Sequence, residues 1–211
     1  MRSWVRFVVL IAIIGTVKAE GIEAIRLPPP QTEGGMPFMQ ALKARHSSRE
    51  FSIRPLPIQV LSNLLWAATG VNRPASAHRT APSAKNMREI SVYVAAADGT
   101  YIFEPDAHAL RRVSERDIRA LTGTQDFVGN APLNLVYVAD LSRMDTSEED
   151  KHFYSATDTG VIAENVYLFC ASAGLATVVR GSVDRKALAA ALNLAPHQQV
   201  TLAQTVGYPK E

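Results

Sequence analysis

The sequence predicts an α+β domain, because stretches with helical apolar spacing alternate with short apolar runs that are typical of strands. The chain has 211 residues, a length at which one domain buries roughly 70% of its unfolded surface. Hydrophobic residues make up 47% of the chain and charged residues 20%, which excludes a disordered protein. Its single cysteine excludes both an internal disulfide framework and a multi-cysteine metal site.

The N-terminus has the pattern of a secretory signal peptide over residues 1–19. Basic residues precede an apolar run at 7–14, and the segment ends in Val17-Lys18-Ala19. An uncleaved signal anchor is the alternative, although the run is about half the length that spans a bilayer. We therefore expect an exported protein, periplasmic or secreted, with no stable membrane span after cleavage.

The net charge of the whole chain, +2, comes largely from this segment. Residues 1–19 hold three basic residues and no acidic one, so the remainder has 19 basic against 20 acidic residues. A nucleic-acid-binding domain needs a basic face, and this balance indicates none. Residues 20–35, with Pro28-Pro29-Pro30 and Gly34-Gly35, predict a flexible N-terminal arm outside the core, which leaves residues 36–211 as the domain.

The first part of the domain predicts two helices and a loop. Apolar spacing favours a helix over residues 36–49, which ends in the polar cluster Arg45-His46-Ser47-Ser48-Arg49. A Pro-punctuated turn at 54–57 leads to a second helix over residues 58–69, with a stop at Gly70. Residues 71–86 are rich in Pro, Ser, Ala and basic residues, and they predict a loop.

The rest of the domain predicts strands interleaved with helices. Residues 90–97 and 101–103 flank Asp98-Gly99 and predict a β-hairpin, whereas 107–121 predicts one or two polar helical stretches. The long helix predicted over 154–173 is apolar on more than one face, as in helices at the middle of a protein or at an interface. The remaining elements are a buried strand at 133–139, strands at 176–180 and 200–206, and a helix at 184–192 with Asp184 as N-cap.

Several familiar catalytic patterns are absent from the sequence. It contains no G-x-G-x-x-G after a strand, no P-loop, no G-x-S-x-G and no H-E-x-x-H, and its five histidines lie far apart. We therefore expect no metal site. Cys170 lies among apolar residues of the long helix, which predicts a buried, inert thiol rather than a nucleophile.

Three polar segments could bind a ligand. The two arginines and two serines of residues 45–49 suit an anion, although a solvated helix end explains them as well. In residues 80–86 the Asn86 amide could form hydrogen bonds to the edge of a heterocycle. The alternative is that the segment is an ordinary loop. In residues 178–182 a strand meets Gly181, where backbone N–H groups could approach a ligand closely.

Together these segments resemble the FMN-dependent nitroreductase-like flavoproteins, including the SagB-type members. "ARHSSREF" resembles the opening R-x-S-x-R-x-F of that family, and "RTAPSAKN" resembles its P-S-x-x-N loop. "DTGVIAENVYLFCASAGLATVVRG" is similar to its central helix and following strand, and "QTVGYPKE" to its C-terminal V-G-Y-P. The resemblance extends from about residue 41 to residue 210.

The resemblance implies an FMN site shared by an intertwined homodimer, in a fold with a mixed sheet flanked by helices. The cofactor-binding residues that it implies are Arg45, His46, Ser47 and Arg49 for the phosphate and ribityl chain, Pro82, Ser83 and Asn86 lining the flavin from the partner subunit, and Arg180 and Gly181 at the edge of the flavin ring. A backbone N–H would lie near flavin N5. The Arg180 side chain would stabilise the anionic reduced flavin if it pointed toward the ring.

The implied activity is hydride transfer through the flavin, from a nicotinamide or another reduced donor to a small nitro, quinone or similar acceptor. No side chain is required as acid or base. The alternatives are a flavin dehydrogenase or oxidase acting on a peptide or small molecule, like the azoline oxidases of the family, and a flavin-binding dimer without turnover. Two departures bear on the site: the chain stops at Glu211 soon after V-G-Y-P, and Met87-Arg88-Glu89 replaces the small or Gln residues and Pro-Trp of many relatives.

Overall fold

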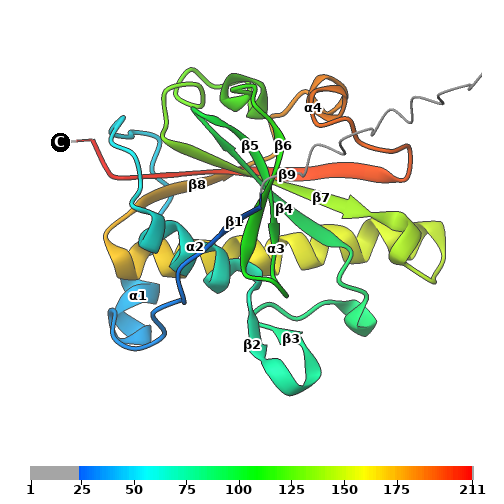
Figure 1. The fold of residues 1–211 in the computed structure, drawn as a ribbon, viewed down its shortest axis with the longest axis horizontal. Helices are drawn as coiled ribbons and strands as arrows, with labels where there is room; N and C mark the ends of the chain where they lie inside the picture. The colour runs from blue at the N-terminus through cyan, green and yellow to red at the C-terminus, as the bar shows by residue number, and fades with distance from the viewer. Residues whose placement is uncertain (1–23, 211) are drawn as a thin grey trace, which may run out of the picture.

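The computed structural model describes residues 24–210, which fold into four α-helices and nine strands (Figure 1). The predicted signal peptide at residues 1–19 lies outside the described residues. Seven of the strands form one sheet in the order β1-β6-β5-β4-β7-β9-β8. The α+β class predicted from the sequence is confirmed.

Every strand pair of this sheet is antiparallel, so the parallel pairs that a mixed sheet would contain are not found among the described residues. Short turns join β4 to β5 and β5 to β6, and such turns connect antiparallel neighbours. A longer connection that contains α4 (Arg185–Ala191) joins β8 to β9. The strands of the sheet are β1 Ala24–Arg26, β4 Ile90–Ala96, β5 Gly99–Glu104, β6 Ala109–Ser114, β7 Leu133–Asp140, β8 Ala176–Arg180 and β9 Gln198–Gly207.

The central strand β7 is covered on both faces, as its continuous apolar run predicts. Leu133, Leu135 and Tyr137 contribute to a core cluster shared with helices α2 (Ile58–Thr69) and α3 (Glu148–Ala173). Val136 and Val138 alternate with them and contribute to a second cluster that includes Leu188 of α4 (Arg185–Ala191). Helices α1, α2 and α3 therefore lie on one side of the sheet and α4 on the other (Figure 1).

The long helix α3 spans Glu148–Ala173 and begins six residues before the predicted start. The Ser147 side chain caps its N-terminus by accepting a hydrogen bond from Asp150 N, and three acidic residues occupy the first turn. Because those first turns are polar, apolar spacing alone could not locate them. Its C-terminal cap is Gly174, in the left-handed conformation with φ +66°.

Two predicted helices need correction. Helix α1 spans only Phe38–Ala44, because Arg45 adopts extended backbone angles and the chain then follows strand β8. The polar stretch at 107–121 forms strand β6 and a short 3-10 helix, Arg119–Thr122, instead of α-helix. A turn at 105–108, with His108 at φ +46°, pairs β6 with β5 as a second hairpin.

Other predictions agree with the structure. Helix α2 spans Ile58–Thr69, and the β4–β5 hairpin pairs Ala96 with Gly99 across the predicted turn. The 71–86 loop contains a small hairpin of β2 (Val71–Arg73) and β3 (His78–Arg79). Cys170 is fully buried, and burial raises the pKa of its thiol far above the usual range, as expected of an inert residue.

The described part of the predicted N-terminal arm packs against the domain. Strand β1 pairs with β6 at one edge of the sheet, and Leu27, only 4% exposed, contributes to the core. The Ser62 hydroxyl of α2 donates a hydrogen bond of 2.6 Å to the Pro28 carbonyl. Helix α2 thus supplies the hydrogen-bond donor that the Pro28 carbonyl lacks in its own segment.

Candidate functional site

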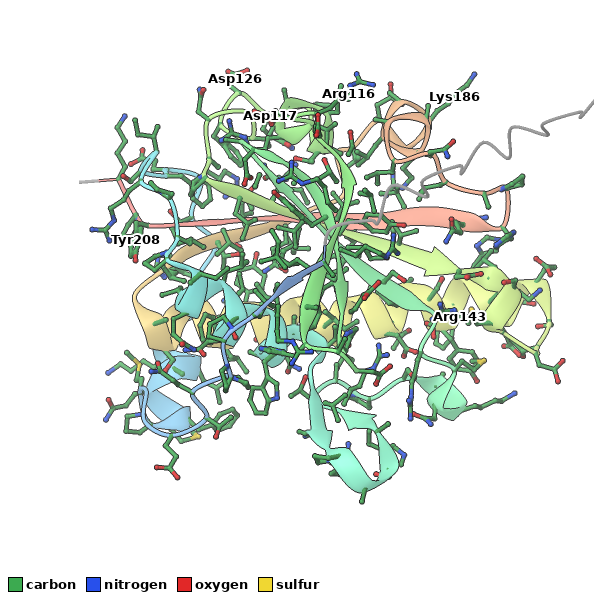
Figure 2. All side chains as sticks on the ribbon, in the orientation of Figure 1. Arg116, Asp117, Asp126, Arg143, Lys186 and Tyr208 are labelled. Atoms are coloured by element: carbon green, nitrogen blue, oxygen red, sulfur yellow. The ribbon has the colours of Figure 1, made fainter. Side chains whose placement is uncertain are left out.

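Residues 45–49 run along the outer edge of β8, the last strand of the sheet. Ser48 N donates a hydrogen bond of 2.9 Å to the Thr177 carbonyl, and farther on Ser52 N donates to the Tyr208 carbonyl at 2.9 Å. Figure 2 shows Tyr208 at the end of the sheet from which the C-terminus leaves. The polar cluster is therefore an extended segment beside a sheet edge. The sequence predicts the end of a helix at this position, and that prediction is wrong.

Tyr167 of α3 fastens this segment to the strand. Its hydroxyl accepts a hydrogen bond from Val179 N at 3.0 Å and lies 2.7 Å from the Ser47 hydroxyl, 120 residues away in the sequence. The Arg45 guanidinium lies 5.3 Å from the centroid of the Tyr167 ring. Sequence reasoning counted Tyr167 as one apolar residue of a helix and missed this contact.

The cations of the segment have no acidic partner among residues 24–210. Arg49 and His46 are exposed, and His46 bonds only the nearby Ala44 carbonyl, at 2.8 Å. Neither Arg45 nor Arg49 forms an ion pair within this part of the chain. Two free guanidinium groups with the Ser47 hydroxyl form a donor set that suits a phosphate.

Strand β8 ends at Arg180, and the next residue, Gly181, is exposed. A Cβ added to Gly181 would meet only the Leu202 side chain, at 3.8 Å, so packing within the chain does not require a glycine. Strand alternation places the N–H of Gly181 on the same outer edge as that of Val179. The position therefore fits a flat ring that approaches the backbone closely.

The Arg180 side chain points to the opposite face of the sheet, contrary to the expectation that it would reach a ligand. It is 5% exposed, donates to the Thr122 carbonyl at 2.6 Å and donates to Asn134 Oδ1 at 3.0 Å. Burial lowers the pKa of this guanidinium to about 10, which leaves it charged at neutral pH. Arg180 thus attaches the end of β8 to Thr122 and Asn134.

The loop with Pro82, Ser83 and Asn86 lies elsewhere in the same chain. Its Ala84 N donates a hydrogen bond of 2.8 Å to Asp158, which lies nine residues before Tyr167 in α3. That separation is about 13 Å along a helix. The single chain therefore brings residues 45–49 together with Gly181, but not with residues 82–86.

An open cavity of about 590 Å³ adjoins Gly181 through Leu202 and Arg185. Its volume is in the range of small-molecule sites. Arg185 donates to the carbonyls of Val200, Thr201 and Gly181, and the neighbouring Lys186 projects outward from α4 (Figure 2). Side chains from α3, α4 and β9 line the cavity: His152, Ser155, Ala156, Arg185, Lys186 and Thr201.

Residues 24–210 contain no group of His, Cys, Asp or Glu side chains placed to hold a metal ion. Within the same residues, no helix combines the length and apolar character needed to cross a bilayer.

Comparison with known proteins identifies the chain. Residues 42–208 match the Nitroreductase family. The chain belongs to the nitroreductase family. Membership of this family supports an oxidoreductase, and its members typically bind flavin.

Three relatives illustrate the similarity. The crystal structure of a protein from Ralstonia eutropha JMP134, described as a nitroreductase, is 46% identical with a TM-score of 0.86, and the match covers 89% of this chain and 90% of that one. A protein of Methanocaldococcus jannaschii, also described as a nitroreductase, is 33% identical over 149 residues, 65% of this chain and 75% of that protein. The NADPH:FMN oxidoreductase of Vibrio harveyi shares the fold, with 19% identity, a TM-score of 0.63, and coverage of 82% and 69%.

Proposed function

We propose that this oxidoreductase binds FMN along the outer edge of β8. Arg45, His46, Ser47 and Arg49 would hold the phosphate and ribityl chain, and Gly181 would offer its backbone to the edge of the flavin ring. The observation that carries the proposal is a pair of arginines without an acidic partner among residues 24–210, beside a strand edge that is followed by a glycine. FMN supplies hydride transfer when bound, between a nicotinamide or another reduced donor and a small nitro, quinone or similar acceptor.

The chain's own residues would bind and orient the cofactor and substrate. Tyr167 fixes Ser47 to β8, and Arg180 and Arg185 fix the backbone on either side of Gly181. The cavity beside Gly181 has room for an acceptor, with Lys186 and His152 at its walls. No side chain at this site is required to act as an acid or base.

The proposal extends to a homodimer in which a second subunit supplies Pro82, Ser83 and Asn86. In one chain these residues lie too far along α3 to meet residues 45–49. Large apolar side chains exposed on α1 and α3, among them Phe38, Met39 and Phe153, support a second subunit on this side. We also propose export after cleavage at residue 19, which an intact mass beginning at Glu20 would test.

The test of the FMN site is Arg45→Ala, with Lys43→Ala as the matched control. Both changes remove one cation from neighbouring positions, but only Arg45 lies at the proposed phosphate site. Hydrogen bonds to charged groups contribute about 1.5–3 kcal/mol. The FMN dissociation constant should therefore rise about tenfold or more in Arg45→Ala, but not in Lys43→Ala. A wild-type protein that binds no FMN, or equal affinity in the two variants, would overturn the proposal.

A further inference from the structure

Two buried carboxyl groups, those of Glu89 and Asp158, interact beside the loop at 82–88. Glu89, the residue before β4, is 0% exposed, and Asp158 of α3 is 5% exposed. No other residue among 24–210 donates a hydrogen bond to either carboxylate oxygen of Glu89, and the weak contact with its own backbone N–H lowers its pKa less than burial raises it. A buried, ionised carboxylate without donors is strongly disfavoured, so the ionised form is unsuited to this position.

A single proton shared with Asp158 resolves the conflict. Asp158 Oδ2 accepts a hydrogen bond from Ala84 N at 2.8 Å, which leaves its other oxygen for a proton carried by Glu89. Burial and the negative charge of Asp158 raise the pKa of Glu89 to about 7. Protonated Glu89 is then a donor to Asp158, and both side chains are satisfied.

The loop above the pair is held in an unfavourable shape. Lys85, Asn86 and Arg88 all have positive φ, at +50°, +58° and +53°, a conformation that residues other than glycine rarely adopt. The loop keeps this shape through a few contacts: Ala84 N donates to Asp158, Arg88 N donates to the Ser83 hydroxyl at 3.0 Å, and the Arg143 guanidinium donates to the Arg88 carbonyl at 3.1 Å. From outside the loop, Asp158 therefore holds the end near Ser83, and Arg143 holds the other end.

We propose that Glu89 is a positioning residue: the proton that it shares with Asp158 holds the loop at 82–88 in the shape that presents Pro82, Ser83 and Asn86 to the flavin of a second subunit. The inference rests on the proposed function. Loss of the proton would place two negative charges side by side in the interior. Displacement of Asp158 or of the loop would reduce the repulsion between them.

Other charged groups around the pair do not replace the proton. Arg79 of β3 is mostly buried and pairs with Asp106 at 3.8 Å, and Arg143 pairs with Asp140 at 3.4 Å. Figure 2 shows Arg143 beside the N-terminal part of α3. Arg143 favours the ionised form of Glu89, but no cation forms an ion pair with Glu89 among the described residues. Arg88 in the loop directs its Nε to Asn86.

The first experiment measures the FMN dissociation constant of wild type, Glu89→Gln and the exposed control Glu149→Gln at pH 6 and pH 8.5. Glutamine keeps an N–H donor toward Asp158 at every pH. From pH 6 to 8.5, wild type and Glu149→Gln should lose about tenfold in affinity relative to Glu89→Gln. The FMN phosphate titrates in the same range, but its effect is common to all three proteins. Parallel profiles would overturn the proposal.

The second experiment needs no flavin and measures urea unfolding from pH 4.5 to pH 8. Since the folded protein holds a proton that the unfolded chain has released, stability should fall as pH rises through this range and level off above about pH 7. Glu89→Gln should lack this fall. If wild type binds no FMN at any pH, the proposed function fails while this profile still tests the shared proton. A pH effect on stability without one on FMN affinity would overturn the positioning role.

Discussion

A single hydroxyl on Tyr167 connects α3, β8 and the segment at 45–49. Its two partners, Ser47 and Val179, belong to parts of the chain far from it and from each other. The ring is 6% exposed, so the hydroxyl acts where water competes little for its hydrogen bonds. One polar atom thus sets the distance between the proposed phosphate-binding segment and the strand.

Tyr167→Phe should loosen that segment without disturbing the helix. We expect a loss of about 1 kcal/mol in the free energy of unfolding, together with weaker FMN binding, because Ser47 and Val179 N lose a shared partner. Urea unfolding and flavin titration measure the two effects. Tyr154→Phe is the control, since no hydrogen bond of its hydroxyl occurs among residues 24–210. Equal effects in both variants would contradict the role of Tyr167.

The face of the sheet to which the Arg180 side chain points could not be predicted from the sequence. Both faces of β8 are covered, so Val178-Val179-Arg180 shows no alternation of apolar and polar residues. Without alternation, the face to which Arg180 points depends on the register of β8 against β9, where Arg180 pairs with Ala203. The resemblance implied a role for the Arg180 side chain only if it pointed toward the flavin ring, and the register directs it toward Thr122 and Asn134 instead.

At the scale of elements, α3 contains one glycine in its interior and ends at another. Gly160 lies mid-helix, where a Cβ would meet nothing within 4 Å. Gly174 caps the helix with φ +66°, a conformation that favours glycine. The same substitution should therefore have opposite effects at the two positions.

Gly160→Ala should raise the free energy of unfolding by roughly 0.5–1 kcal/mol, because alanine is the better helix former. Gly174→Ala should lower it by about 1 kcal/mol, because the left-handed cap is strained for alanine. Each variant is the control for the other in urea unfolding. A loss of stability in Gly160→Ala would indicate that a second subunit lies against that face of α3 in solution.

Elements with a strong apolar pattern were predictable, and elements defined by pairing were not. Helix α2 and strand β7 bury continuous or periodic apolar faces, and their sequences show it. Strand β6, with Arg111 and Arg112, carries a polar sequence, and its strand state comes from pairing with β5. For the same reason the helix at 36–49 was predicted too long: the contact of Ser48 with Thr177 is not local.

For the whole molecule, exposed apolar side chains gather on α1, which packs against α3. Phe38 is 64% exposed, Met39 73% and Leu42 41%. Soluble monomers rarely expose such clusters, and a second subunit would cover them. The separation between residues 45–49 and 82–86 in one chain also favours a second subunit.

The double variant Phe38→Ser/Met39→Ser should therefore shift a dimer toward monomers. Each side chain buried at an interface contributes about 1.5–3 kcal/mol, so the loss from two subunits is large. Sedimentation velocity of wild type, the double variant and Val113→Ser measures it. Val113, exposed on β6, is not part of the α1 surface. A dimer that resists the double change would place the interface elsewhere.

The strand edge that would hold the cofactor is also an aggregation hazard. The outer edge of β8 presents backbone groups able to pair with any other strand, and only Ser48 and Tyr167 occupy them among the described residues. We expect the segment at 45–49 to hinder the pairing of this edge with a strand of another molecule. Cells that make more chain than flavin should accumulate the protein in insoluble form, and supply of flavin during expression should restore soluble yield.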